Sequence, residues 1–362
     1  MSVDYKNLSK EDMLYLMKIE DDAELFKEAY KIKLEHVGRE VYYRGLIEIS
    51  NICVKDCLYC GIRKSSNISR YSTNLEEILE RAQWAYKNNY GSITLQSGER
   101  SDVEFVEFIE DVLMKIKKMS NNELGITLSL GEQTKETYKK WFDAGAHRYL
   151  LRIETTNEEL YNKIHPNDLN HNFKTRLNAL KSLKEIGYQV GSGVMIGIPE
   201  QKEMDLVNDI IFFKDMDLDM IGMGPYVVSE ATPLGKEVIR SSRNTAKDKN
   251  NRLNKSLKMI ALTRLYLKDI NIASTTALQT LDPKGREKGL LAGANILMPI
   301  ITVDKFKKNY QLYDGKPCLE DASDDCKQCL AGRIDGIGEE IGYNKWGDSP
   351  HFKNKKKMFD KQ

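Results

Sequence analysis

The sequence predicts an α/β protein whose main unit is a complete (β/α)8 barrel of the TIM type. Eight short β-branched or apolar runs are spread along its 362 residues, and charged stretches with apolar residues at helical spacing lie between them. Such alternation implies a parallel sheet with right-handed crossovers, and eight repeats are enough to close it. The predicted strands are residues 42–49, 92–96, 126–130, 148–153, 189–196, 220–224, 272–276 and 295–298.

Helical spacing is clearest in two of the intervening stretches. It is formed by Leu75, Ile78, Leu79, Ala82 and Ala85 in the first, and by Leu177, Leu180, Leu183 and Lys184 ahead of Gly187 in the second. We expect three parts in the chain: a helical segment over residues 1–40, the barrel over 41–300 and an extension over 301–362.

The overall composition favours a cytoplasmic protein that acts on small molecules. The chain has 55 Lys and Arg against 54 Asp and Glu, so nothing in the total charge points to nucleic acid or an anionic membrane surface. No run approaches the ~18 apolar residues of a membrane span, and the first residues lack an apolar signal region. The six cysteines form two tight triplets, which suggests metal sites in a reducing compartment rather than disulfides.

The first cysteine triplet is the strongest functional signal. Cys53, Cys57 and Cys60 have C-x3-C-x2-C spacing, and three thiolates on a 4Fe-4S cluster leave one iron without a protein ligand. That iron can chelate S-adenosyl-L-methionine (SAM), and electron transfer to the sulfonium releases a 5'-deoxyadenosyl radical. This spacing is the radical-SAM signature. A zinc knuckle is the alternative, but closed zinc sites usually have four ligands and His36 lies far upstream.

Polar residues follow the predicted strands, where the active sites of such barrels gather. The cysteine loop follows the first strand, and residues 96–99, 129–132 and 152–156 follow the next three. Glu132 could equally be a solvated surface residue. The glycine-rich stretch 191–200 matches neither a G-x-G-x-x-G nor a P-loop template, but glycines there let the backbone approach a flat ring.

Six stretches together resemble the HydE family, the radical-SAM maturases of [FeFe] hydrogenase. They are residues 47–63, 95–99, 127–132, 148–154, 222–225 and 273–276, and the resemblance covers roughly residues 40 to 330. It implies a complete barrel in which Cys53, Cys57 and Cys60 hold the catalytic 4Fe-4S cluster.

The resemblance also implies sites for SAM and for the substrate. The residues expected to contact SAM are Tyr59, Ser97, Gly98, Glu99, Ser129, Glu154, Arg176 and Met195. Among them, Glu99 would hold the methionyl amine and Arg176 a carboxylate, although Arg176 could instead form a helix-surface ion pair. The residues expected to hold an anionic substrate are Arg44, Thr275, Thr276 and Tyr313.

The second triplet, Cys318, Cys326 and Cys329, matches a second cluster site that only some family members carry. It would hold a 2Fe-2S or 4Fe-4S cluster or stay empty. We expect it at the surface, too far from the radical to react with it.

The implied function is assembly of the diiron subcluster of [FeFe] hydrogenase, with a small cysteine-bound iron carbonyl and cyanide complex as substrate. Other maturases and an electron donor such as ferredoxin or flavodoxin are the implied partners. A methylornithine-synthase-like mutase or another radical-SAM enzyme acting on an amino-acid-derived substrate is the alternative. Sulfur insertion as in biotin synthase is disfavoured. That enzyme sacrifices a second cluster whose ligands lie within the barrel, whereas every cysteine here is in the first loop or near the C-terminus. A scaffold that carries a cluster without cleaving SAM is the non-enzymatic alternative.

Overall fold

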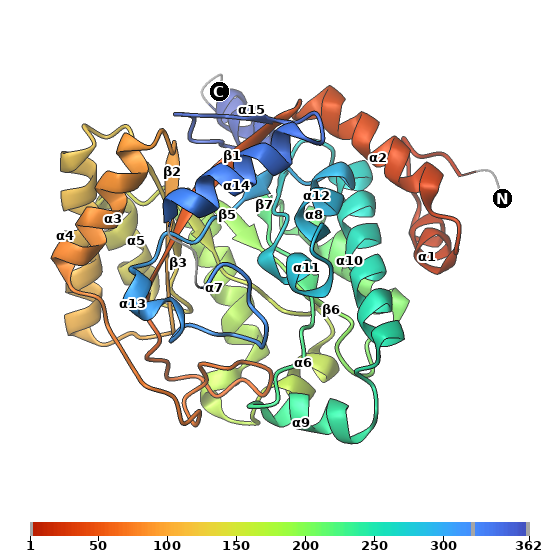
Figure 1. The fold of residues 1–362 in the computed structure, drawn as a ribbon, viewed down its shortest axis with the longest axis horizontal. Coiled ribbons are helices and arrows are strands. Elements are labelled where there is room, and N and C mark those ends of the chain that lie inside the picture. The colour runs from red at the N-terminus through yellow and green to blue at the C-terminus, as the bar shows by residue number, and fades with distance from the viewer. Residues whose placement is uncertain (1–2, 320–322, 360–362) are drawn as a thin grey trace.

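A curled parallel sheet forms the centre of the molecule, and helices cover its outside (Figure 1). The computed structural model describes residues 3–319 and 323–359. Every pair of neighbouring strands is parallel. In sheet order the strands are β10 (Ile296–Leu297), β1 (Glu40–Ser50), β2 (Ser92–Ser97), β3 (Gly125–Ser129), β4 (Arg148–Leu150), β5 (Gln189–Ser192), β7 (Met220–Ile221) and β9 (Asn271–Ile272).

Hydrogen bonds also connect the two ends of this strand order. Ser274 N donates to Ile296 O and Asn295 N to Ile272 O, both over 2.9 Å. β11 (Glu340–Ile341) adds a further parallel pairing with β1, and β6 (Met195–Ile196) and β8 (Gly224–Pro225) form a separate two-stranded parallel sheet. The predicted architecture of alternating strands and helices around a curled parallel sheet is therefore confirmed.

The predicted strands are in the right places, but several are shorter than expected. The run 148–153 forms a strand only over β4, and the run 189–196 is divided into β5 and β6. The run 272–276 ends as a strand at Ile272, because Thr275 takes the extended conformation of a helix N-cap and Thr276 begins a helix.

The outer helices begin and end where local sequence signals place them. Asn74 forms a capping box with Glu77 at the start of α3, and Gly187 ends α7 with a left-handed φ of 102°. The helices are α1 (Lys10–Lys18), α2 (Ala23–His36), α3 (Leu75–Lys87), α4 (Val103–Met119), α5 (Lys135–Asp143), α6 (Glu158–Ile164), the short 3-10 helix η1 (Leu169–His171), α7 (Phe173–Ile186), α8 (Glu203–Asp215), α9 (Pro233–Arg240), α10 (Ala246–Leu267), α11 (Thr276–Leu281), α12 (Gly285–Leu291), α13 (Asp304–Lys307), α14 (Ser323–Asp335) and α15 (Pro350–Phe359).

The two faces of the sheet differ in chemistry. Along β1, Ile47 and Ile49 belong to the hydrophobic core under the helices, whereas Arg44 and Glu48 alternate with them and are buried on the other face. Arg44 contacts the Met220 sulfur on β7, so that face is the inside of the curled sheet. The polar residues that line it are fully buried and need partners within the fold.

Residues 347–349 supply some of those partners at the amino-terminal ends of the strands. Gly347 O accepts hydrogen bonds from Arg44 Nη2 over 3.2 Å and from Asn271 Nδ2 over 2.8 Å. Asp348 Oδ1 accepts from Arg148 Nη1 over 2.7 Å. Arg148 and Asn271 are the first residues of β4 and β9, so this segment covers one end of the sheet and leaves the carboxyl ends at the other.

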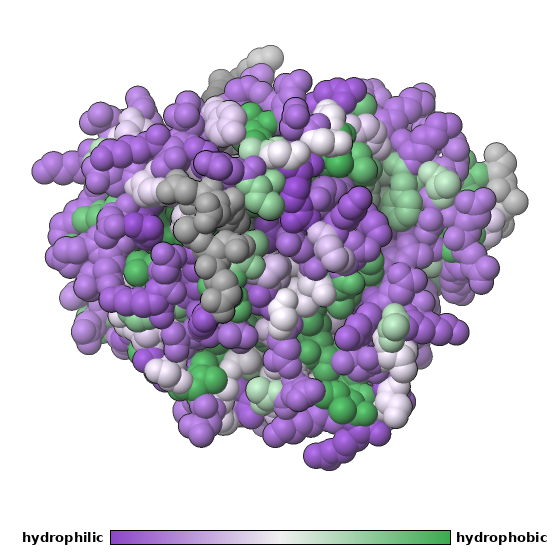
Figure 2. Space-filling model, viewed as in Figure 1, coloured by the Kyte–Doolittle hydropathy of each residue, from purple (hydrophilic) through white to green (hydrophobic). Residues whose placement is uncertain are grey.

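The surface is mostly polar, with hydrophobic residues in small groups on the face seen in Figure 2. Within residues 3–319 and 323–359, we find no helix with the length and apolar character needed to span a bilayer.

Candidate functional site

The cysteine loop begins directly after β1, at the carboxyl end of the sheet. Gly98 N donates to Ser50 O over 2.8 Å, and Glu99 N donates to the Cys53 sulfur over 3.3 Å. A β-carbon on Gly98 would lie 2.3 Å from the Ile52 carbonyl oxygen, so a larger residue there would displace the loop. The end of β2 therefore supports the loop through its backbone.

The three thiols of this loop lie close enough to influence one another. Burial, followed by the neighbouring Cys60 thiol, raises the pKa of Cys57 well above its ordinary value. Burial also raises the pKa of Cys53, and it raises that of Cys60 to about 12. Buried thiols become thiolates when a cationic metal centre compensates the charge. Three such thiols on one loop fit an iron–sulfur cluster.

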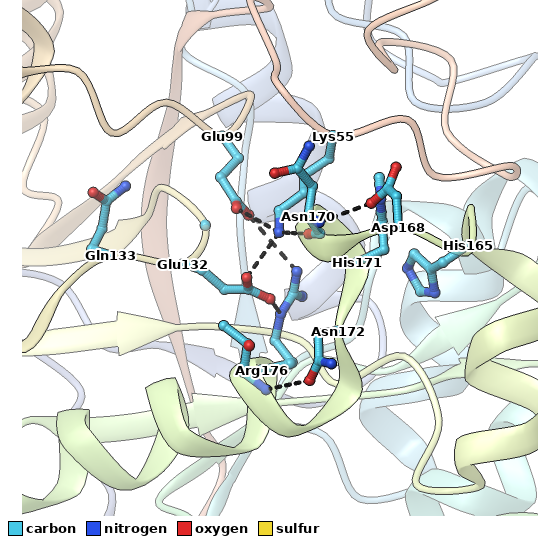
Figure 3. Close-up of polar contacts among 12 residues, drawn as sticks. Lys55, Glu99, Glu132, Gln133, His165, Asp168, Asn170, His171, Asn172 and Arg176 are labelled. Atoms are coloured by element: carbon cyan, nitrogen blue, oxygen red, sulfur yellow. Dashed lines mark hydrogen bonds and ion pairs between the residues drawn. The ribbon is translucent and has the colours of Figure 1, made fainter.

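Four charged side chains form a buried group beside the cysteine loop (Figure 3). We call Lys55, Glu99, Glu132 and Arg176 the charge cluster. Lys55 Nζ lies 3.1 Å from Glu99 Oε1 and 2.8 Å from Glu132 Oε2. Arg176 binds Glu132 through Nε, and its Nη2 lies 3.7 Å from Glu99 Oε2. Two cations and two carboxylates thus balance one another in a largely buried setting.

The two carboxyl groups of the charge cluster differ in their electrostatics. Burial raises the pKa of Glu99 despite the charges of Arg176 and Lys55. Burial acts on Glu132 in the same direction, but Arg176 and Lys55 outweigh it and hold the pKa of Glu132 below its ordinary value. Glu132 is therefore the carboxylate that the two cations keep ionised, and we call it the fixed anion of the group. Glu99 is the carboxylate that can more easily exchange a cation partner for a ligand.

The structure resolves two alternatives that the sequence left open. Glu132 is not a solvated surface residue, because its side chain is only 10% exposed and binds both cations. Arg176 is not part of a helix-surface pair, because it is buried and also donates to Arg152 O over 2.7 Å. Lys55 was missed as a site residue. Its place two residues after Cys53 was the available signal.

The remaining residues expected to bind SAM are buried or half-buried. Ser97 is buried and donates to Gly98 O over 2.6 Å, and Ser129 is the half-buried last residue of β3. Met195 lies in a small apolar cluster against which Tyr59 packs. Glu154 has a left-handed φ of 66°, a conformation that is uncommon outside glycine and is frequent at functional sites.

The residues expected to hold substrate fall into two places. Thr276 Oγ1 accepts from Arg286 Nη2 over 3.3 Å, and Tyr313 lies near Arg286, with its pKa raised by burial to about 12. Arg286 is 2% exposed, and within the described residues its Nε and Nη1 have no hydrogen-bond partner, nor has Thr275 Oγ1. Sequence analysis missed Arg286. Arg44 lies apart, at the amino-terminal end of the sheet.

The second cysteine triplet is described only in part. Cys318 is half-buried with a left-handed φ of 64°, and Cys329 is exposed on α14 beside Arg333. The side chain of Cys326 lies outside the described residues. Across the side chains that the structure does describe, no three of His, Cys, Asp or Glu are arranged to bind a single metal ion.

The fold and the site define a class of protein. The Radical SAM superfamily model matches residues 47–213. Two solved structures share the fold. Methylornithine synthase (PylB) has a TM-score of 0.78 and 24% identity, with 93% of this chain and 95% of that chain covered. The [FeFe]-hydrogenase maturase HydG from Carboxydothermus hydrogenoformans has a TM-score of 0.77 and 21% identity, with 94% of this chain and 77% of that chain covered. The protein is a radical SAM enzyme, and its class uses a 4Fe-4S cluster and SAM.

Curated relatives narrow this class. The chain is 44% identical over 324 residues to the [FeFe] hydrogenase maturase subunit HydE of Thermotoga maritima, which covers 89% of this chain and 88% of the relative. It is 29% identical over 338 residues to a 3-methylornithine synthase of Methanosarcina acetivorans, over 92% and 90%. The chain belongs to the HydE family.

Proposed function

We propose that this chain is an [FeFe] hydrogenase maturase that reductively cleaves SAM and acts on a small cysteine-bound iron complex with carbon monoxide and cyanide. The observation that carries the proposal is the charge cluster joined to a loop of three half-buried cysteines, in a chain 44% identical to HydE. A structural metal site needs cysteines alone, whereas the paired charges offer partners for a zwitterionic ligand.

In this proposal Cys53, Cys57 and Cys60 hold the 4Fe-4S cluster. When bound, the cluster and SAM together would supply a 5'-deoxyadenosyl group able to abstract hydrogen. Glu99 would receive the methionyl amine and Arg176 the methionyl carboxylate. The other residues that would line the SAM site are Tyr59, Ser97, Gly98, Ser129, Glu154 and Met195. The existing ion pairs keep both charged groups oriented before SAM arrives.

Arg286 supports an anionic substrate. A buried guanidinium with two nitrogens, Nε and Nη1, that lack protein partners among the residues described favours a ligand that supplies oxygen acceptors. Thr275, Thr276 and Tyr313 would complete this subsite with hydroxyl donors, and a carboxylate on the cysteine-bound complex fits it. Arg44 would act at the far end of the curled sheet, as a buried positive charge.

We extend the proposal to the rest of the chain. The sheet would be a complete barrel over residues 41–300, between a helical segment 1–40 and an extension 301–362, and the bridge between Ala273 and Ile296 supports closure. Cys318, Cys326 and Cys329 would hold a second 2Fe-2S or 4Fe-4S cluster. The protein would work in the cytoplasm with other maturases and a ferredoxin or flavodoxin.

Two assays test this proposal. Anaerobically reconstituted protein, incubated with a chemical reductant and SAM, should form 5'-deoxyadenosine; without that product the chain would be a cluster scaffold. In a maturation mixture with apo-hydrogenase and the other maturases, omission of this protein should abolish hydrogen evolution. Hydrogen evolution that is unchanged by the omission would reject the maturase role and leave the SAM chemistry standing.

A mutase of the 3-methylornithine synthase kind is the second candidate, because the chain is 29% identical to such an enzyme over 92% of its length. Formation of 3-methylornithine from common amino acids with SAM would favour it. The maturase proposal expects none of that product under conditions in which 5'-deoxyadenosine accumulates.

A further inference from the structure

We propose that His171, oriented by Asp168, is a positioning residue for Cys57. It accepts a hydrogen bond from the peptide N–H of Asp56 and so fixes the backbone that carries the Cys57 thiol. The inference rests on the proposed role of Cys57 as a cluster ligand.

The cysteine loop is attached to a single segment on both sides of Cys57. This segment, residues 164–171, runs from the last residue of α6 toward α7, and we call it the clasp (Figure 3). Four hydrogen bonds join it to the loop: Lys55 Nζ to Asn170 O, Asp56 N to His171 Nε2 over 2.8 Å, Leu58 N to Ile164 O over 3.0 Å, and Tyr59 Oη with His165 Nε2 over 3.2 Å. The residue between the inner two of these attachments is Cys57.

The partners of His171 determine which of its ring nitrogens carries the proton. A backbone N–H can only donate, so His171 Nε2 must accept from Asp56 and be unprotonated. The proton is therefore on Nδ1, which lies 2.7 Å from Asp168 Oδ1. That carboxylate oxygen also accepts from Asn170 N over 2.8 Å, so its own position is fixed. A carboxylate that orients an imidazole in this way sets the direction of the opposite nitrogen.

His165 attaches the other side of the loop in the same manner. Its Nδ1 lies 2.8 Å from Tyr161 O and donates to it, so Nε2 accepts from the Tyr59 hydroxyl. The ring also stacks on Tyr161, with 4.0 Å between centroids. His165 therefore attaches a side chain of the loop, whereas His171 attaches the backbone next to a proposed ligand.

His171 is 4% exposed, so water does not readily replace it as the acceptor for Asp56. When the acceptor is removed, the Lys55–Asp56 peptide must turn to find another partner, and the backbone that leads to the Cys57 thiol moves with it. Loss of an outer partner of a metal ligand typically weakens metal binding about 10- to 100-fold. The same principle predicts a weaker hold on the cluster when His171 cannot accept a hydrogen bond.

The test compares His171→Leu with His171→Gln in the reconstituted full-length protein. Leucine fills space without an acceptor, whereas the glutamine oxygen reaches about as far as Nε2. We expect His171→Leu to lose iron to a chelator ~10-fold faster than the unchanged protein. It should also show a shifted EPR spectrum of the reduced cluster. His171→Gln should restore most of both properties, and His36→Gln, on α2, serves as the matched control.

Equal iron loss in His171→Leu and the unchanged protein would overturn the proposal. Equal damage in His171→Leu and His171→Gln would also overturn it, because the acceptor would then be irrelevant. Circular dichroism of the apo-proteins separates both results from misfolding. Cys57→Ala separates this inference from the function proposed above: if that variant keeps its full iron content, the ligand assignment has failed whatever His171 does.

Discussion

The two ends of the curled sheet both bury charged groups, but they do so differently. At the amino-terminal end, Arg44 and Arg148 are bonded to residues 347–349 of the same chain. At the carboxyl end, the charge cluster is balanced within itself, and Arg286 keeps N–H groups without a protein partner in the described residues. Arg44 Nε and Arg148 Nη2 also have no partner among the described residues, but each of these arginines makes at least two other contacts. Arg286 has two nitrogens without a partner there, and its guanidinium donates to Thr276 Oγ1 over 3.3 Å. Buried charge that is held mainly by the fold serves stability, whereas buried charge with more donors left over is suited to a ligand.

Substitution of Cys57 by alanine should give the largest effect, and only at the carboxyl end. The variant should lose the EPR signal of the 4Fe-4S cluster proposed on the cysteine loop and form no 5'-deoxyadenosine, because the two remaining thiolates would hold that cluster poorly. Its apo-form should unfold at nearly the temperature of the unchanged apo-protein. Cys329→Ala, at an exposed position, is the matched control and should still cleave SAM. Cleavage retained in Cys57→Ala would contradict the ligand assignment.

Asp348→Ala should damage the amino-terminal end instead. It leaves the buried Arg148 guanidinium without its carboxylate, a change that typically costs ~3–5 kcal/mol of unfolding free energy. Urea denaturation measures this loss. Asp143→Ala removes the exposed pair with Lys139 and should cost at most ~1 kcal/mol. If the Asp348 variant is as stable as the Asp143 variant, then residues 347–349 do not stabilise the fold through the Arg148 ion pair.

Glu132→Gln should weaken SAM binding while leaving the amino-terminal end unaffected. Without this fixed anion, Lys55 and Arg176 both turn to Glu99 and compete with the methionyl amine. Loss of one hydrogen bond to a charged group corresponds to roughly a 10- to 100-fold rise in KM for SAM. Kinetics of 5'-deoxyadenosine formation provide the measurement, with Glu110→Gln on the outer face of α4 as the control. An unchanged KM would exclude Glu132 from SAM binding.

The smallest expected effect is a pH dependence at the amino-terminal end. Hydrogen bonds to Asp217 and Asp269 raise the pKa of His351 to about 9. Because the pKa of His351 is higher in the folded state than in the unfolded state, the protonated imidazole stabilises the fold. This stabilisation is complete below the unfolded-state pKa of about 6.5 and is lost as pH rises through about 9. Since His351 is partly exposed, we expect ~1 kcal/mol or less. The difference in melting temperature between the unchanged protein and His351→Gln should shrink from pH 6 to pH 10; a constant difference would contradict it.

Local sequence signals predicted the elements better than the contacts between them. All eight strand positions could be predicted, because each is a short apolar run bounded by helical spacing. The closeness of Glu99 and Glu132 follows from the parallel register, in which Gln96 pairs with Ser129. The position of Lys55 in the cysteine loop placed it near the site, but its contact with Asn170 could not be predicted, because that residue is 115 positions away. Asp348 meets Arg148 across 200 residues, and no periodicity carries that information.

The segment that covers the amino-terminal end of the sheet has a consequence for biosynthesis. Residues 347–349 are synthesised after every strand of the sheet, so Arg44 and Arg148 lack these acceptors until that segment has been made. A chain truncated before Gly347 could form its cysteine loop but could not satisfy those arginines. Chains that lack this segment would thus have a loosened sheet that is open to proteolysis, even when their cysteine loop has formed.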